Sequence, residues 1–481
     1  MSKQNSISSG LFWKLLERFG VQGVQFVLQL VLARVLDPVH YGDLSIIIIF
    51  VNLAQVFIQA GLGTALIQNK DVTEEDYSSV FWVTFLLAGV AYVLLFLGAP
   101  LIAAFYKMPN IVSPFRVIAL MLFPGALNSV QMAKISRELD FKKIFYSNIG
   151  ANLLSGIAGI CLAMLGAGLW ALVFQTLLSI TVVCVTMWFT VAWRPRLVFN
   201  IQRVKVLFAF GWKLLVSSLL DSLYSNLSSL VVGKKYDSET LAYYNRGNHF
   251  PMFIINSINA SIQSVLLPAM SAKQDNAGQV KRIMRTSIVM SSYIILPLMA
   301  GLAAVATPMV QVLLTDKWLP CVPYLQIFCF TMAFYPVHSS NLQAINAMGR
   351  SDIFLKLEII KKIMGISVLA VAVFAFDTPI AIAASGILTT LLSFLINAFP
   401  NKKLIGYSYL EQIKDILPSL LLAAAMCLTV LLLQNLPFAP ILVLIIQIAA
   451  GMVFYVGLSA LLKLQPFLQL LQMLKKFLKK S

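Results

Sequence analysis

Charged residues are scarce in this sequence, and acidic residues are the scarcer kind. Only 11% of the residues are charged, with 19 Asp and Glu against 36 Lys and Arg, whereas a soluble domain averages about 25% charged residues. This shortage, combined with 59% hydrophobic residues, excludes a soluble enzyme and predicts an integral membrane protein. The net charge of +17 does not indicate a nucleic-acid-binding protein, because the basic residues are spread over many short loops.

Patterns that would hold a disulfide framework or a metal ion are missing as well. The five cysteines are odd in number and none forms a CxxC pair, and His40, His249 and His338 lie far apart in the sequence. Neither a disulfide framework nor a zinc site is supported by such spacing. We expect no metal and no cofactor. The loops are too short for an extramembrane catalytic domain, so we also expect no enzymatic activity.

Long apolar runs are what the sequence has in abundance. The run FWVTFLLAGVAYVLLFLGAPLIAAF at 81–105 is longer than the roughly 20 residues that a spanning helix needs. Such runs predict an all-α polytopic membrane protein with about 14 transmembrane helices, from 10–36 to 440–462. Lys and Arg concentrate on alternate loops, which places both termini in the cytoplasm by the positive-inside rule. The basic tail is expected to lie on the anionic inner leaflet as an amphipathic helix.

An internal repeat groups the expected helices. WKLL at 13–16 recurs at 212–215, and FPGALNSVQ at 123–131 matches YPVHSSNLQ at 335–343. These matches occur in the same order, as expected for two copies of one bundle. Parallel repeats are found in transporters, so we expect two lobes to enclose a central cavity that opens to either side in turn. The predicted parts are an N-terminal six-helix lobe at 1–200, its C-terminal parallel repeat at 201–403, two additional transmembrane helices at 404–463 and a basic amphipathic cytoplasmic tail at 464–481.

Amide side chains form lines along several expected helices. In the first span, Gln22, Gln25 and Gln29 are spaced three and four residues apart, so they share one helix face. Amides are costly in lipid and should face the bundle interior or water, where they can donate to and accept from sugar hydroxyls. The alternative is that they only bond helix to helix. The candidate substrate-cavity residues are Arg18, Gln22, Gln25, Gln29, Asn52, Gln55, Gln59, Asn128, Gln131, Tyr224, Asn256, Asn259 and Gln343.

Four basic residues and one acid have separate candidate roles. Arg18 continues the line of amides and suits a phosphate-bearing head group, while Lys14, Lys213 and Lys361 are expected at the cytoplasmic entrance. Asp221 is the acid nearest the middle of a span, and an acid in that position is a candidate site for a coupling proton or sodium ion. The alternatives are interfacial anchoring for the lysines and local ion pairs for Asp221 and Lys361.

Five segments in sequence order resemble one transporter family. They are LARVLDPVHYGDLS, GLGTALIQNKD, RELDFKKI, LLPAMSAKQDN and LLTDKW. Together they are similar to the polysaccharide exporter branch of the multidrug/oligosaccharidyl-lipid/polysaccharide (MOP) superfamily, and in particular to Wzx-type O-antigen and colanic-acid flippases. The resemblance covers the first twelve expected spans, and no catalytic motif comes with it.

The resemblance implies a substrate, a location and partners. It implies flipping of undecaprenyl-diphosphate-linked oligosaccharide repeat units from the cytoplasmic to the periplasmic leaflet of the bacterial inner membrane. The units would serve lipopolysaccharide or exopolysaccharide biosynthesis, alongside a polysaccharide polymerase and glycosyltransferases. Two other functions stay open, a cation-coupled drug exporter of the same superfamily and, with less support, a membrane glycosyltransferase or polymerase. The scarcity of membrane acids argues against the first, and the short outer loops argue against the second.

Overall fold

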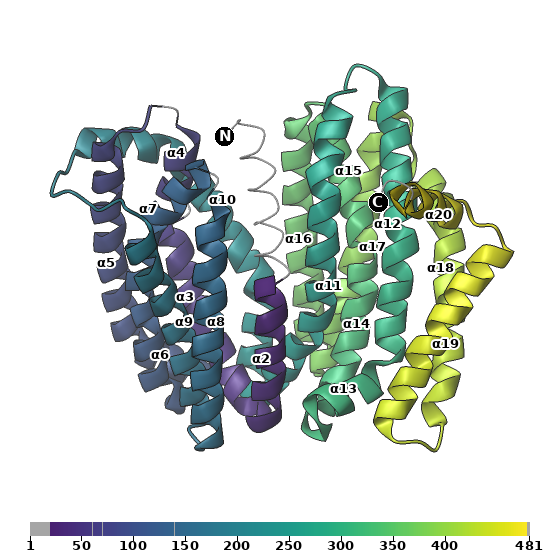
Figure 1. Cartoon of the computed structure of the whole chain (residues 1–481), viewed down its shortest axis with the longest axis horizontal. Helices are drawn as coiled ribbons and strands as arrows, with labels where there is room; N and C mark the ends of the chain where they lie inside the picture. Colours follow the sequence, from purple (N-terminus) through teal and green to yellow (C-terminus); the bar gives the residue numbers. More distant parts are fainter. Residues whose placement is uncertain (1–19, 60, 70, 139, 479–481) are drawn as a thin grey trace. The chain divides into compact units, whose positions relative to one another are not determined.

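The computed structural model describes residues 20–59, 61–69, 71–138 and 140–478 (Figure 1). This part of the chain is helical and contains no β-strand, so the all-α prediction is confirmed for it. The chain divides between Ala242 and Tyr243 into two compact units, called here unit 1 and unit 2 in chain order. The last residues of unit 1 begin a long helix that continues into unit 2.

Unit 1 is built mainly from long helices that run up and down. Its α-helices are α2 (Gln22–Val35), α3 (Pro38–Gln59), α4 (Leu62–Gln68), α5 (Glu74–Tyr106), α6 (Val112–Ile118), α7 (Leu122–Glu138), α8 (Phe141–Met164), α9 (Leu169–Thr190) and α10 (Ile201–Lys235), with short 3-10 turns at Pro109–Ile111 and Ala119–Met121. Antiparallel packing of α8 against α9 follows from the short turn that joins them.

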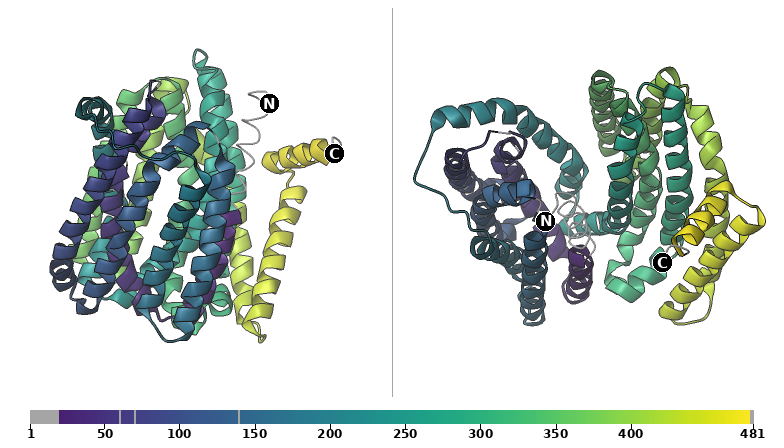
Figure 2. Two further views of the ribbon diagram at one scale, coloured as in Figure 1. Left: turned by 60° about the vertical axis from the view of Figure 1, so that its left-hand side comes forward. Right: turned by 45° about the horizontal axis from the view of Figure 1, so that its top comes forward.

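Unit 2 continues with the same kind of helices. They are α11 (Ser238–Ser271), α12 (Ala277–Ala304), α13 (Ala306–Leu314), α14 (Val322–Ala333), α15 (Tyr335–Ala347), α16 (Ser351–Ala375), α17 (Pro379–Ile405), α18 (Tyr409–Leu432), α19 (Pro440–Leu461) and α20 (Gln465–Leu478), with 3-10 turns at Asp316–Cys321 and Leu433–Asn435. The helix α20 lies across the direction of α19 (Figure 2), as expected for an amphipathic helix at a membrane surface.

Within the described residues, twelve helical segments are long and apolar enough to cross a membrane. The chain is therefore a multi-span membrane protein. Two more of the fourteen expected spans are not among the twelve. The first, 10–36, lies partly outside the described residues, and its described part is the shorter apolar helix α2. The other is α16, which forms a helix of 25 residues but carries several charges in its first half. The count of fourteen stays a prediction.

The helix α10 packs against α3, α4 and α5 within unit 1. Near its start, Gly211 and Gly61 approach so closely that a Cβ on Gly211 would lie 2.5 Å from the Gly61 carbonyl oxygen. Beyond its other end, the hydroxyl of Ser238 donates a 2.5 Å hydrogen bond to Oδ1 of Asp43, which is buried on α3. The division into compact units consequently falls after α10. The boundary predicted at 200/201 concerns the sequence repeat and stays a prediction.

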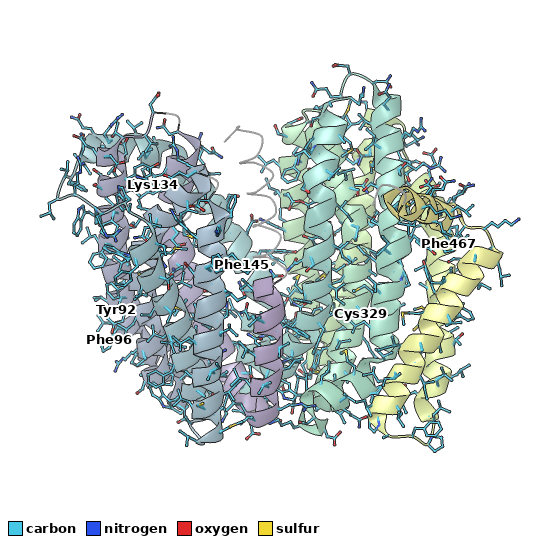
Figure 3. All side chains as sticks on the ribbon, in the orientation of Figure 1. Tyr92, Phe96, Lys134, Phe145, Cys329 and Phe467 are labelled. Carbon is cyan, nitrogen blue, oxygen red and sulfur yellow. The ribbon has the colours of Figure 1, made fainter. Side chains whose placement is uncertain are left out.

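The segment before α10 is tied to the N-terminal end of α5. There Thr73 and Asp76 form a capping box, in which each side chain accepts a hydrogen bond from the other's backbone N–H. Asp76 also pairs with Arg203, with 3.2 Å from Oδ1 to Nε. Its neighbour Glu74 accepts a 2.7 Å hydrogen bond from Nε1 of Trp193. Figure 3 labels Lys134, whose Nζ lies 3.4 Å from the same carboxylate group. The linker between α9 and α10, together with the first turn of α10, is thus held by charged and aromatic side chains.

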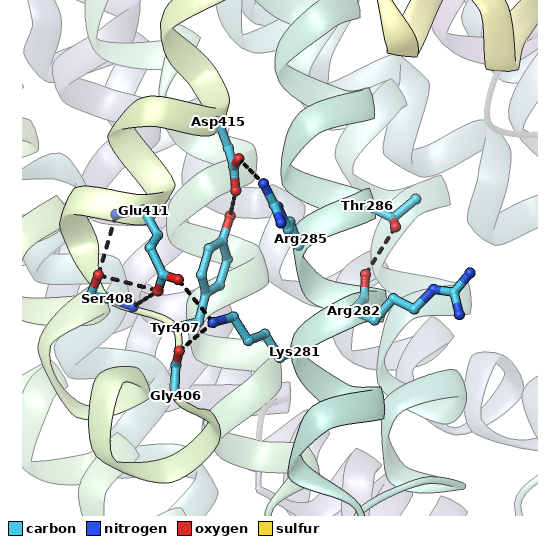
Figure 4. A network of polar contacts seen from close by, with 9 residues as sticks. All are labelled: Lys281, Arg282, Arg285, Thr286, Gly406, Tyr407, Ser408, Glu411 and Asp415. Atoms are coloured by element: carbon cyan, nitrogen blue, oxygen red, sulfur yellow. Dashed lines mark hydrogen bonds and ion pairs between the residues drawn. The ribbon is translucent and has the colours of Figure 1, made fainter.

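A second polar cluster joins α18 to α12 in unit 2 (Figure 4). Arg285 on α12 contacts Asp415 on α18 at 2.6 Å, and the hydroxyl of Tyr407 donates to the same carboxylate at 2.7 Å. One turn away along α18, Glu411 lies 3.0 Å from Nζ of Lys281. These contacts fix the first turns of α18 against α12.

Candidate functional site

Unit 1 contains an open cavity of about 620 Å³ that is lined by α2, α3, α4, α7, α8 and α9. Its polar lining residues are Gln25, Gln29, Gln55, Gln59, Thr64, Asn128, Ser129, Ser136, Asn148, Asn152, Ser155, Gln175, Thr176 and Ser179. No charged side chain belongs to the lining among the described residues. A cavity of this size is within the range of small-molecule sites, about 300–1,000 Å³.

The structure brings five of the predicted cavity residues together here. They are Gln25 and Gln29 on α2, Gln55 and Gln59 on α3, and Asn128 on α7. Three other predicted residues lie on these same helices without lining the cavity. Gln131 is fully buried beside it, Asn52 is exposed on α3, and Gln22 lies one turn before Gln25.

The contact of α3 with α7 sets the position of two of these amides. The Nε2 atom of Gln59 donates a 2.9 Å hydrogen bond to the carbonyl oxygen of Gly125. The amide of Gln55 lies directly over Gly125, where a Cβ would be 1.8 Å from its Nε2, so only glycine leaves room for it. Two buried oxygens, Oε1 of Gln55 and Oδ1 of Asn128, have no hydrogen-bond partner. Buried polar atoms are normally bonded, so these two acceptors are available to a ligand.

The helices α8 and α9 complete the cavity with residues that sequence reasoning missed. Asn148, Asn152 and Ser155 are four and three residues apart on α8, and Gln175 and Ser179 are four apart on α9. The same helical spacing that identified the amides of α2 would have marked each set as a polar helix face, but not the cavity that the two sets share.

Unit 2 contains a separate open cavity of about 470 Å³ that is lined by α11, α15, α16 and α17. Two predicted residues, Gln343 and Lys361, line it. The Nζ atom of Lys361 lies 2.6 Å from Oε1 of Glu358, so the predicted alternative of a local ion pair is present. The remaining lining residues are Gln263, Tyr335, His338, Ser339, Leu342, Asn346, Phe354, Thr389, Thr390, Ser393 and Asn397.

The other predicted site residues line neither cavity. Lys213, Asp221 and Tyr224 lie on α10, and Asn256 and Asn259 lie on α11. Lys14 and Arg18 lie outside the described residues. Cavity, coupling and entrance roles for these seven residues stay predictions.

Known proteins resemble this chain in sequence. The sequence profile of the family described as "Polysaccharide biosynthesis protein" matches residues 31–323. "Teichuronic acid biosynthesis protein TuaB" of Bacillus subtilis is 25% identical over 350 residues, which cover 72% of this chain and 72% of that protein. "Lipopolysaccharide biosynthesis protein WzxC" of Escherichia coli is 24% identical over 422 residues, which cover 86% of this chain and 84% of that protein.

Solved structures share the fold. The lipid II flippase MurJ, in an inward closed conformation, matches with a TM-score of 0.75 at 15% identity, over 94% of this chain and 98% of that one. An inward-facing MATE-family transporter of the MOP superfamily matches with a TM-score of 0.61 at 16% identity, over 81% of this chain and 98% of that one. Because the profile matches more than half of the sequence, the chain belongs to the family described as "Polysaccharide biosynthesis protein".

Proposed function

We propose that this protein flips undecaprenyl-diphosphate-linked oligosaccharide repeat units from the cytoplasmic to the periplasmic leaflet of the bacterial inner membrane. The units would be assembled afterwards into lipopolysaccharide or exopolysaccharide. The observation that carries the proposal is the cavity of unit 1, whose described lining is uncharged and rich in amides, in a chain of a polysaccharide biosynthesis family.

The chemistry of this cavity favours a glycan over a cationic drug. An amide presents an acceptor oxygen and two donor hydrogens, and a hydroxyl can do both, so the lining can pair with sugar hydroxyls in either direction. A cationic drug would need a carboxylate to offset its desolvation, and the described lining of the cavity contains none. The amide-rich lining therefore supports the flippase over the drug exporter.

The transport cycle is proposed to be alternating access. The internal repeat supports two lobes that rock against each other, with Arg18 at the diphosphate, Lys14 and Lys213 at the cytoplasmic entrance, and Asp221 as the site for a coupling proton or sodium ion. Both termini would face the cytoplasm, and polymerase and glycosyltransferases of the pathway would act beside the protein. Replacing Arg18 or Asp221 by alanine should block export while the protein still inserts in the membrane.

Depletion of the protein in its host tests the function. Lipid-linked oligosaccharide should accumulate on the cytoplasmic face of the inner membrane, and surface polysaccharide should fall. Drug susceptibility should not change. A normal amount of surface polysaccharide together with increased drug susceptibility would refute the flippase and support the drug exporter.

Point variants test the unit 1 cavity. Gln55→Leu and Asn128→Leu each remove an unpaired acceptor from the lining, so surface polysaccharide should fall severalfold at equal protein level in the membrane. Gln447→Leu is the matched control, because Gln447 is a fully buried amide of unit 2 that lines neither cavity. Normal export by both cavity variants would remove the assignment of the cavity.

A further inference from the structure

The cavity of unit 2 differs in chemistry from that of unit 1. It contains the ion pair of Glu358 and Lys361 on α16, whose side chains are 29% and 15% exposed. His338 on α15 also lines it, with Nδ1 3.5 Å from Nδ2 of Asn397. An ion pair at the wall of a membrane-embedded cavity is costly to desolvate, so its presence calls for a role.

Three oxygen atoms in this cavity are buried without a hydrogen-bond partner. They are Oε1 of Gln343, Oδ1 of Asn397 and Oγ of Ser339. The side chains of Asn397 and Ser339 are almost completely buried, at 1% and 8% exposure. The first two are acceptors and cannot donate. Because unsatisfied buried acceptors cost about 1–3 kcal/mol each, the cavity is complementary to a ligand that donates hydrogen bonds.

The charges argue against an ion as that ligand. The ammonium of Lys361 is paired with the Glu358 carboxylate at 2.6 Å, so the pair carries no net charge to attract a phosphate. A metal ion needs several oxygens at about 2.0–2.6 Å and would meet that ammonium, and a cavity of about 470 Å³ is far larger than a dehydrated ion. Among the described residues, no group of three or more His, Cys, Asp or Glu could hold a metal.

A sugar residue satisfies each of these conditions. Its hydroxyls can donate to the unpaired oxygens and to the carboxylate of Glu358, and they can accept from Lys361 and from the hydroxyls of Thr390 and Ser393. Tyr335 and Phe354 also line the cavity, and an aromatic ring presents an apolar face to the C–H face of a pyranose.

The internal repeat supports the same conclusion. In the alignment of the matched segments 123–131 and 335–343, Gln343 corresponds to Gln131. They also relate α15 to α7, so the helices α15, α16 and α17 that line this cavity follow the order of α7, α8 and α9 in unit 1. We propose that the cavity of unit 2 is a second binding site for an uncharged, hydroxyl-rich sugar residue of the transported glycan, with Asn397 and Gln343 as its acceptors. This inference rests on the proposed flippase function.

Cysteine protection tests the site directly. The five native cysteines are replaced by alanine, and single cysteines are introduced as Ser393→Cys in unit 2 and Ser179→Cys in unit 1. Each serine lines its cavity. Membranes are treated with a small water-soluble thiol reagent, with or without the oligosaccharide repeat unit released from the host's own polysaccharide by mild hydrolysis. Both cysteines should be labelled, and the oligosaccharide should slow both reactions.

An additional variant measures the role of the unpaired acceptor. In the Ser393→Cys background, Asn397→Leu should raise the oligosaccharide concentration for half-protection about fivefold, the value of one lost hydrogen bond. Glu358→Gln should also weaken protection, since it removes an acceptor. Inorganic pyrophosphate is the anionic probe, and it should not protect the cysteine in unit 2.

Each contrary outcome has a separate meaning. Protection of Ser179→Cys without protection of Ser393→Cys would overturn the second site and leave the proposed function standing. Absence of labelling at Ser393→Cys and at a Thr390→Cys variant would also overturn it, because the cavity would be closed to water. Protection by pyrophosphate alone would identify an anion site instead. Normal polysaccharide export after depletion would remove the proposed function itself.

Discussion

The side chain of Asn341 connects three helices of unit 2, and its replacement gives a graded prediction. Its Nδ2 donates to Oε1 of Gln412 on α18 at 2.8 Å, and its Oδ1 accepts from Nε2 of Gln412 at 3.1 Å. The same Oδ1 accepts from Nδ2 of Asn401 on α17 at 2.8 Å. All three side chains are fully buried. Two of these interhelical bonds hold α18 against α15, and the third joins α17 to α15. Both α15 and α17 line the unit 2 cavity.

The contacts give the expected size of each effect. Interhelical hydrogen bonds in membrane proteins average about 0.6 kcal/mol each. Asn341→Leu removes three of them and should lower the free energy of unfolding by about 2 kcal/mol. Gln412→Leu removes two and should cost about 1 kcal/mol. Gln447→Leu removes one bond, from Nε2 to the carbonyl oxygen of Val430, and should cost about 0.6 kcal/mol.

Unfolding of the purified protein by SDS titration, followed by tryptophan fluorescence, measures this order. Each of the three variants replaces a buried amide by leucine, so the change in the free energy of burial is similar in all of them. The differences in stability among the variants then reflect the number of lost hydrogen bonds. Gln412→Asn serves as a conservative variant and should recover part of the loss in Gln412→Leu. An Asn341→Leu protein as stable as the wild type, or Gln447→Leu as the most damaging of the three, would refute the reasoning.

Two further predictions use the same titration. Gly42→Ala should destabilise the protein by about 1–3 kcal/mol or more, because the new Cβ would lie 1.7 Å from the carbonyl oxygen of Ser238. Gly89→Ala is the control, since its Cβ would meet nothing within 4 Å, and it should stabilise its helix by about 0.5–1 kcal/mol. Equal effects of the two variants would contradict the close approach of α3 to the start of α11. Glu358→Gln should destabilise the protein by about 1–3 kcal/mol, because it leaves the ammonium of Lys361 without its carboxylate partner. Adding Lys361→Met to this variant should restore stability. A double variant less stable than Glu358→Gln alone would show that the pair does not act as a unit.

The lines of amide side chains show how much of the site the sequence alone can predict. Spacing of three and four residues placed Gln25 with Gln29 and Gln55 with Gln59, and both pairs line the unit 1 cavity. Asn52 has the same helical spacing from Gln55 on α3, yet it does not line the cavity and is exposed. Periodicity defines an angular position on a helix, but the neighbouring helix decides which part of that face is enclosed.

The sequence by itself determined that this protein crosses a membrane many times as helices. The free energy of placing about 20 apolar residues in lipid is a sum over the side chains of one segment. A spanning helix can therefore be recognised from its own residues, without knowledge of the helices that it packs against. Only the tertiary structure decided that Asn148 and Gln175 join the amides of α2 and α3, and that Glu358 and Lys361 belong to a cavity wall. Those juxtapositions depend on the packing of helices far apart in the chain, and no local pattern of residues encodes it.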